Sequence, residues 1–203
     1  MLPILASLFI ITLIISHALK KEQRESEKVL NEYFSRERAA NRTRRQPLDD
    51  LAYVEIPFDF IPKSLLEDNE TVQDCHRILE GLSDKKIVNF TGYTNTDLKL
   101  QYGVSNLATL TAYDENYTLY ARTIYKLAKL YYDNGYESNA RILLEKAIES
   151  GTDITANYTL LASIYQTKGE YDKINNLLTQ ADTLRSASKG NIKRSLEEYV
   201  RTD

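Results

Sequence analysis

The residue types that most often carry out chemistry are sparse in this chain. It has one cysteine, Cys75, and two histidines, of which only His76 lies outside the apolar N-terminal segment. Neighbouring side chains on a helix point about 100° apart, so Cys75 and His76 cannot serve as a nucleophile and a base on one face. We therefore expect Cys75 to be a core residue and His76 a surface residue.

The sequence also lacks the spacings that bind metals and phosphates. It has no glycine-rich phosphate loop and no cluster of Cys and His at metal-ligand spacing. Paired acids such as Asp49 with Asp50, or Glu197 with Glu198, are more simply read as solvated charge. We therefore expect no enzymatic activity, no cofactor and no metal.

The N-terminal segment 1–19, MLPILASLFIITLIISHAL, contains no charged side chain. As a helix it would reach roughly 28 Å, close to the ~30 Å thickness of the hydrocarbon core of a bilayer. Residues 20–45 then hold nine basic residues and five glutamates, a local net charge of +4. By the positive-inside rule, we expect a single-pass membrane protein with an uncleaved anchor at 1–19 and its C-terminal body in the cytoplasm.

The alternative is an exported or cell-surface domain, released when residues 1–18 are cleaved as a signal peptide. The sequence SHA before Leu19 would suit cleavage, but the charge order around the apolar run is opposite to that of exported chains. A single cysteine also fits a reducing compartment. Five Asn-x-Ser/Thr triplets would suggest glycosylation in an exported eukaryotic chain, namely those at Asn41, Asn69, Asn89, Asn116 and Asn157.

Residues 20–45 are expected to form a polar, mostly helical stalk. Its one apolar cluster, too short to predict a coiled coil, is Val29, Leu30, Tyr33 and Phe34. The basic run at 35–45 could neutralise nucleic-acid phosphates, but the orientation of the anchor already accounts for its charge. Residues 46–203 carry 17 basic and 24 acidic side chains, net −7, so we expect no nucleic-acid partner.

Residues 46–69 are expected to be an extended segment that acts as a strap. Val54, Ile56, Phe58 and Phe60 alternate with polar residues and proline, which predicts an extended chain with one apolar face. We expect Phe58 and Phe60 to be buried against the helical body, because an exposed apolar patch is costly. The alternative is that this segment is a docking peptide for another protein.

From residue 70 onward the apolar spacing is helical, with a polar loop at 89–97, and the C-terminal half repeats itself. The stretch KLAKLYYDNGYESNARILLEKA, residues 126–147, returns as LLASIYQTKGEYDKINNLLTQA, residues 160–181. The two stretches begin at residues 126 and 160, and we call the number of positions between these two starts the repeat interval. Six positions match in this register: Leu127 with Leu161, Ala128 with Ala162, Tyr131 with Tyr165, Gly135 with Gly169, Leu144 with Leu178, and Ala147 with Ala181.

Position by position, this pattern resembles the tetratricopeptide repeat, a family with a period of about 34 residues. The resemblance implies two antiparallel helices per repeat, with small residues at their crossings, an aromatic residue between them and glycine in the turn. The sequence departs from the family at Ile174, where alanine is preferred, and at Thr152, where proline is preferred. The layout also resembles membrane-anchored repeat proteins of Gram-positive bacteria.

The expected architecture is all-α: a short solenoid at 70–203 behind the anchor and stalk. Clear repeats are placed at 121–154 and 155–188, with a solvating capping helix at 190–201. Because two repeats seldom bury enough surface alone, we expect residues 70–115 to supply degenerate helix pairs. The sequence NYTL occurs at both Asn116 and Asn157, which predicts Asn caps and a first helix two turns longer than its counterpart.

The resemblance also implies where a partner would bind, because the first helices of each repeat line a concave groove at five recurrent positions. In the first repeat these are Arg122, Tyr125, Lys129, Tyr132 and Asp133, and in the second Ala156, Thr159, Ser163, Gln166 and Thr167. The first set could hold an acidic group and an apolar side chain of a protein or peptide. The alternative is that they are ordinary surface charges and packed tyrosines. The expected function is therefore a membrane-tethered adaptor or scaffold.

Overall fold

The computed structural model describes residues 2–200, and their side chains from residue 15 onward. Every regular element in this range is helical, which confirms the all-α class, and the one extended pairing is an isolated bridge between Tyr53 and Val88. The chain divides into two compact units: residues up to 46 with 95–106, and 47–94 with 107 onward. Residues 95–106, expected in the solenoid, thus group with the stalk.

The first unit is built on one long helix, and its elements are α1 (Leu2–Arg42), α3 (Asn95–Tyr102) and the short 3-10 helix η2 (Val104–Asn106). Helix α3 packs against the C-terminal end of α1, where Ala40 is fully buried. Lys99 forms an ion pair with Glu37, and the Thr96 hydroxyl donates to the same carboxylate at 2.7 Å. The hydrogen bond from Lys99 lowers the pKa of Glu37.

In the first unit, a buried asparagine links the segment after α1 to the segment after α3. Asn106 accepts a hydrogen bond from Nε of Arg45 at 3.1 Å and donates to the carbonyl oxygens of Gln46 and Tyr102 at 2.7 and 2.8 Å. Its side chain is fully buried, so these three bonds satisfy a group that would otherwise be costly to bury. They hold the end of the stalk to the segment that follows α3.

The expected anchor, residues 1–19, falls largely outside the described side chains. Its backbone is helical from Leu2, as part of α1. Among the residues whose side chains are described, no helix is both long and apolar enough to cross a membrane. The anchor therefore remains a prediction from the sequence.

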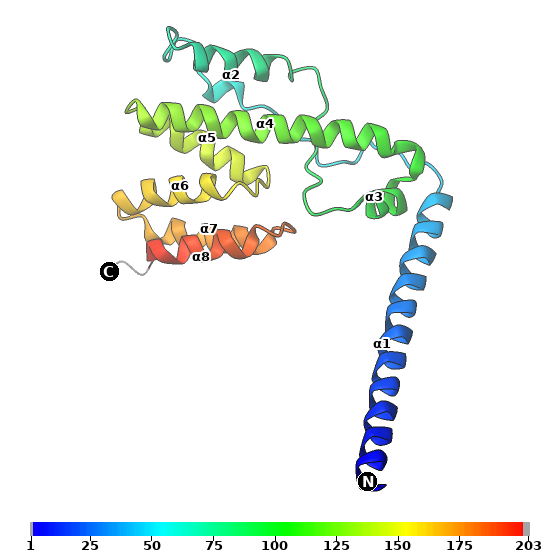
Figure 1. Ribbon diagram of the computed structural model, residues 1–203. Helices are drawn as coiled ribbons and strands as arrows, with labels where there is room; N and C mark the ends of the chain where they lie inside the picture. Colours follow the sequence, from blue (N-terminus) through cyan, green and yellow to red (C-terminus); the bar gives the residue numbers. More distant parts are fainter. Residues whose placement is uncertain (1, 201–203) are drawn as a thin grey trace. The chain divides into compact units, whose positions relative to one another are not determined.

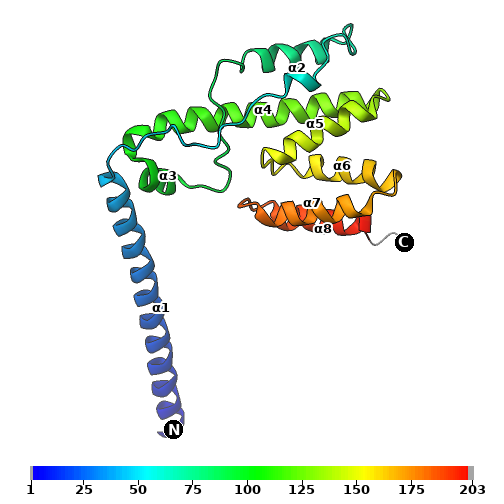
Figure 2. The ribbon, with the colours of Figure 1, turned by 180° about the vertical axis from the view of Figure 1, so that it is seen from behind.

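The second unit is a stack of helices: α2 (Glu70–Glu80), α4 (Leu107–Asp133), α5 (Glu137–Glu149), α6 (Thr155–Thr167), α7 (Tyr171–Thr183) and α8 (Lys189–Val200). Helix α4 lies between α2 and α5, and the order continues through α6 to the pair α7 and α8 (Figures 1 and 2). Helix α7 starts and ends one repeat interval after α5, in agreement with the repeat in the sequence.

The turns within the two helix pairs are also alike. Gly135 and Gly169 have φ of +84° and +68°, a left-handed conformation that favours glycine at a helix end. The residue after each glycine donates its amide to the carbonyl of the preceding aromatic residue, from Tyr136 to Tyr131 at 2.8 Å and from Glu170 to Tyr165 at 2.9 Å. The predicted glycine turns are therefore confirmed.

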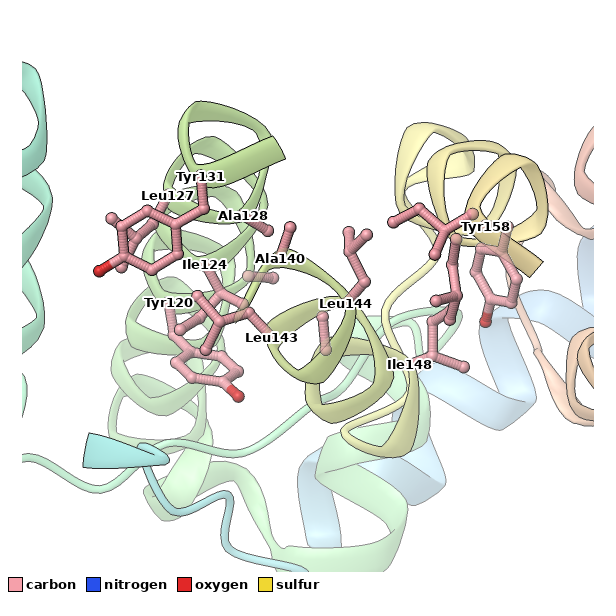
Figure 3. Packing of buried hydrophobic residues seen from close by; sticks show 14 of the residues in the cluster. Tyr120, Ile124, Leu127, Ala128, Tyr131, Ala140, Leu143, Leu144, Ile148 and Tyr158 are labelled. Atoms are coloured by element: carbon pink, nitrogen blue, oxygen red, sulfur yellow. The ribbon is translucent and has the colours of Figure 1, made fainter. Parts of the chain in front are cut away.

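Small buried residues mark the helix crossings in the core. Ala128, Ala140 and Ala147 are fully buried, and Figure 3 shows Ala128 of α4 close to Ala140 of α5. Leucine, isoleucine and tyrosine side chains fill the space around these contacts. Ile174 takes the place of Ala140 in the second pair and is also fully buried, so the core accommodates the larger side chain.

The predicted asparagine caps are wrong. Helix α4 begins at Leu107, about four turns before the position that matches the start of α6 rather than two, so Asn116 lies in mid-helix. Its side-chain amide donates to the carbonyl oxygen of Lys86 at 3.0 Å. Asn157 lies inside α6 and is fully buried. Asn69, in contrast, does cap α2 and accepts from two backbone amides.

The expected degenerate helix pairs at 70–115 are wrong: α2 packs on the long helix α4, whereas α3 groups with the stalk. Cys75 is buried in this contact, as predicted, and burial raises the pKa of its thiol. His76 is half-buried rather than exposed, and burial lowers its pKa.

The strap follows the prediction only in its first half. The Val54 amide donates to the carbonyl oxygen of Ile87 at 2.9 Å, and Val54 and Ile56 pack against the core. The chain then turns into the 3-10 helix η1 (Phe58–Phe60), which breaks the period-two alternation. Phe58 and Phe60 are consequently 40% and 43% exposed, so their predicted burial is wrong, and Ile61 is buried instead.

The polar loop after α2 contacts two segments later in the chain. The Asn89 side chain donates to the carbonyl oxygens of Ser150 and Gly151 at 3.1 and 2.8 Å, in the turn between α5 and α6. Farther along, the guanidinium of Arg185 lies 4.6 Å from the centre of the Tyr93 ring. The loop therefore joins the turn after α5 to the segment between α7 and α8.

Candidate partner-binding face

Four of the predicted site residues lie along one face of α4. Arg122, Tyr125, Lys129 and Tyr132 are spaced by three and four residues, which places them in one row on a helix. Arg122 and Lys129 are exposed, whereas the two tyrosines are half-buried and pack against the core. Helix α4, which carries this row, packs against both α2 and α5.

The charge on this row is uneven. Nζ of Lys129 lies 2.7 and 2.8 Å from the two carboxylate oxygens of Asp133, and this hydrogen bonding raises the pKa of Lys129. Its charge is therefore largely balanced by its own helix. Arg122 forms no ion pair with any residue whose side chain is described. Arg122 is thus the cation on this row that is available to an anionic ligand.

The second predicted set, on α6, is neutral and partly used by the fold. The hydroxyls of Thr159 and Ser163 donate to carbonyl oxygens of their own helix at 3.4 and 2.7 Å. The side-chain amide of Gln166 donates to the carbonyl oxygen of Tyr199 on α8 at 3.2 Å. Gln166 at the end of the α6 set is therefore bound to α8. The charged residues of the predicted site all lie on α4.

Helix α8 corresponds to α6 one repeat interval later, a match that the prediction of a capping helix did not include. It begins one repeat interval after α6, and its buried Ile192 and Leu196 occupy the positions that the buried Tyr158 and Ala162 hold in α6. Helix α8 packs against both α6 and α7, as a further first helix of a repeat would. The shared spacing of these apolar residues could have shown this, but a final helix with many charges was interpreted as a cap.

A network of charged residues on the other helices was also missed. Nε of Arg141 donates to Glu145 at 2.8 Å, and the Tyr165 hydroxyl donates to the same carboxylate at 2.7 Å. Arg141 also contacts Glu170 at 3.3 Å, so the network links α5, α6 and the start of α7. A cavity of about 260 Å³ lies beside it, with Leu161 in its lining. Each charge has an opposite charge close by, which fits a structural role.

Two further hollows lie near the strap. One of about 370 Å³ is lined by Ile56, Phe58, Lys85 and Lys86 among others, and one of about 390 Å³ borders His76. Within the described part of the chain, no three His, Cys, Asp or Glu side chains are grouped so that they could hold a metal ion.

Comparisons of the chain with protein-family models, curated proteins and solved structures found no match.

Proposed function

We propose that the second unit is a tetratricopeptide-like interaction domain that binds a protein or peptide partner along the α4 row. One observation carries this proposal: the helix pairs α4–α5 and α6–α7 are separated by one repeat interval in their sequences and, except for the earlier start of α4, in their helix bounds. Helices that repeat in this way present equivalent side chains as a row, which suits binding of an extended segment. The proposal involves no catalysis, cofactor, metal or nucleic acid.

The chemistry of the row favours an acidic ligand with an apolar neighbour. The Arg122 guanidinium can form two parallel hydrogen bonds to a carboxylate. The rings of Tyr125 and Tyr132 are anchored on the core and can cover an apolar side chain at little entropic cost. The neutral polar groups of α6 would extend this surface.

We also propose that residues 1–19 tether the domain to a membrane, with the body in the cytoplasm. The uncharged segment and the net positive charge of the following stalk support this orientation. The alternative is export with cleavage of residues 1–18. Two of its glycosylation triplets fit poorly, because Asn157 is buried and the Asn89 amide is hydrogen-bonded inside the fold.

Affinity capture with the full-length protein tests the binding face. We expect Arg122→Glu to weaken retention of the partner about tenfold, equivalent to about 1.4 kcal/mol, and to remove much of its salt sensitivity. The matched control is Arg194→Glu, the same charge reversal at an exposed position on α8. Equal retention by parent and Arg122→Glu, with the fold intact by circular dichroism, would exclude this face.

Two assays test the tether. We expect the full-length protein to stay in the membrane pellet after carbonate extraction, and a reporter fused after Asp203 to be active only if it works in the cytoplasm. Activity of an export-dependent reporter, or a mature protein that begins at Leu19, would support the exported alternative.

A further inference from the structure

The middle of α1 is an amphipathic helix that nothing in the structure covers. All side chains from Ile15 to Arg36 are exposed. Six large apolar residues are among them, with exposed fractions of 48–67%: Ile15, Leu19, Val29, Leu30, Tyr33 and Phe34. A single helix of mixed charge is only marginally stable in water, because most helical stability comes from packing of an apolar face.

Four of these six residues, Ile15, Leu19, Leu30 and Tyr33, share one face with the polar residues Gln23 and Ser26. We call this face the open seam; at about 100° per residue, its six side chains project within about one quarter of the helix circumference. From Leu19 to Tyr33 they follow the seven-residue spacing of a coiled-coil seam. The basic residues of this region project from the opposite side: Lys20, Lys21, Arg24 and Lys28.

The open seam continues a face that is already used for packing. Glu37 and Ala40 lie on the same side of α1 as the seam and are the residues that α3 covers. Lys99 and Thr96 bind the Glu37 carboxylate there, and Ala40 is fully buried. The face is therefore packed within the chain at its C-terminal end, and between the proposed anchor and that end it is exposed over residues 20–36, about 24 Å.

We propose that the open seam pairs with the open seam of a second copy of this chain, as a parallel, in-register two-stranded coiled coil. In such a pair, with Leu30 at an a position and Tyr33 at the next d position, Val29 is a g residue and faces the e residue five positions later on the partner helix. Val29 and Phe34 are five residues apart and flank the seam on opposite sides, so each meets the other's copy. The contact between Val29 of one copy and Phe34 of the other is apolar, and it forms only when the two helices are parallel and in register.

The parallel arrangement rests on the membrane tether proposed above. Two copies anchored in one membrane present the same residues at the same height, and their confinement raises the effective concentration. Because α1 is one continuous helix from Leu2 to Arg42, its middle cannot turn to lie on the lipid surface while the N-terminal end spans it. A second copy is thus the occupant that the geometry favours over lipid.

Disulfide crosslinking of the full-length protein in lipid vesicles tests the seam. The parent chain is the blank, because its one cysteine, Cys75, is buried. We expect Leu30→Cys and Tyr33→Cys to form covalent dimers on oxidation. Asn31→Cys and Ser35→Cys, on the opposite face, should crosslink at least fivefold less. Equal crosslinking at all four positions, or none at Leu30→Cys and Tyr33→Cys, would overturn the proposal.

Mass measurement in detergent supplies an independent readout. The parent should be a dimer and the Leu30→Glu/Tyr33→Glu variant a monomer, whereas the matched Asn31→Glu/Ser35→Glu variant should remain a dimer. A parent that is monomeric at every concentration would contradict the pairing, as would crosslinks to a different protein. Carbonate extraction of the same vesicles reports on the tether separately, and crosslinks at Leu30→Cys and Tyr33→Cys would stand even if the protein were extracted.

Discussion

Tyrosine is the residue type that fills most of the large spaces in the core. The chain has 15 tyrosines and no tryptophan, and Tyr120, Tyr131 and Tyr158 are among its largest fully buried side chains. A buried tyrosine must place its hydroxyl as well as its ring. The Tyr158 hydroxyl donates to the carbonyl oxygen of Thr152 at 2.9 Å, whereas that of Tyr131 has no hydrogen-bond partner among the residues that the structure describes.

This difference predicts opposite effects of the same substitution. Tyr131→Phe removes an unsatisfied buried hydroxyl and should raise the free energy of unfolding by about 1 kcal/mol. Tyr158→Phe removes a hydrogen bond, leaves the Thr152 carbonyl short of a donor and should lower it by about 1 kcal/mol. Urea unfolding of the full-length protein measures both. Equal shifts in the same direction would show that the two hydroxyls are not distinguished in this way.

The buried tyrosines also predict a loss of stability in alkali. Burial raises the pKa of Tyr120, Tyr131 and Tyr158 from the ordinary value of 10 to about 12. Between pH 10 and 12 the unfolded chain therefore loses these protons while the folded chain retains them, so the free energy of unfolding falls as the pH rises. Tyr131→Phe should fall less steeply than the parent over this range. Identical slopes in urea titrations from pH 9.5 to 12 would contradict the assignment.

At the scale of elements, the sequence predicts the helices and turns that depend on a local residue pattern. It does not predict the packing that depends on contacts between segments far apart in the chain. The helices α5, α6 and α7 and the turns at Gly135 and Gly169 follow from a repeat that is visible in the sequence. The pairing of α3 with α1 depends on contacts between segments far apart in the chain, such as Thr96 with Glu37. The prediction of an extended strap is wrong from Pro57 onward. The 3-10 helix that follows this residue ends the alternation of apolar and polar residues, although the period-two sequence pattern continues to Phe60.

The corrected strap predicts which of its apolar residues stabilise the fold. Ile61→Ala should lower the free energy of unfolding by roughly 2 to 5 kcal/mol, because Ile61 is buried. The double change Phe58→Ser/Phe60→Ser should cost less, about 1 kcal/mol, since both rings are exposed. Urea unfolding compares the two variants, and an equal or larger loss in the double variant would contradict this ranking. Partner capture by the double variant would then show whether these rings dock to another protein.

At the scale of the whole molecule, the candidate site is predicted less fully than the fold. The sequence resemblance indicates the helix rows, and the structure describes Arg122 and Lys129 as exposed. The sequence could not show that Asp133 balances Lys129 or that Gln166 bonds to α8, because both depend on side-chain positions in the folded chain. These contacts concentrate the proposed recognition on Arg122 and the two tyrosines of α4.

Photocrosslinking in living cells tests the proposed binding face most directly. A photoreactive amino acid at Arg122 or Tyr125 of the full-length protein should capture a discrete protein partner. The same probe at exposed Glu149 or Asn176, on α5 and α7, should capture at least fivefold less. Crosslinks that are absent from Arg122 and Tyr125, or equally strong at all four positions, would contradict binding along the α4 row.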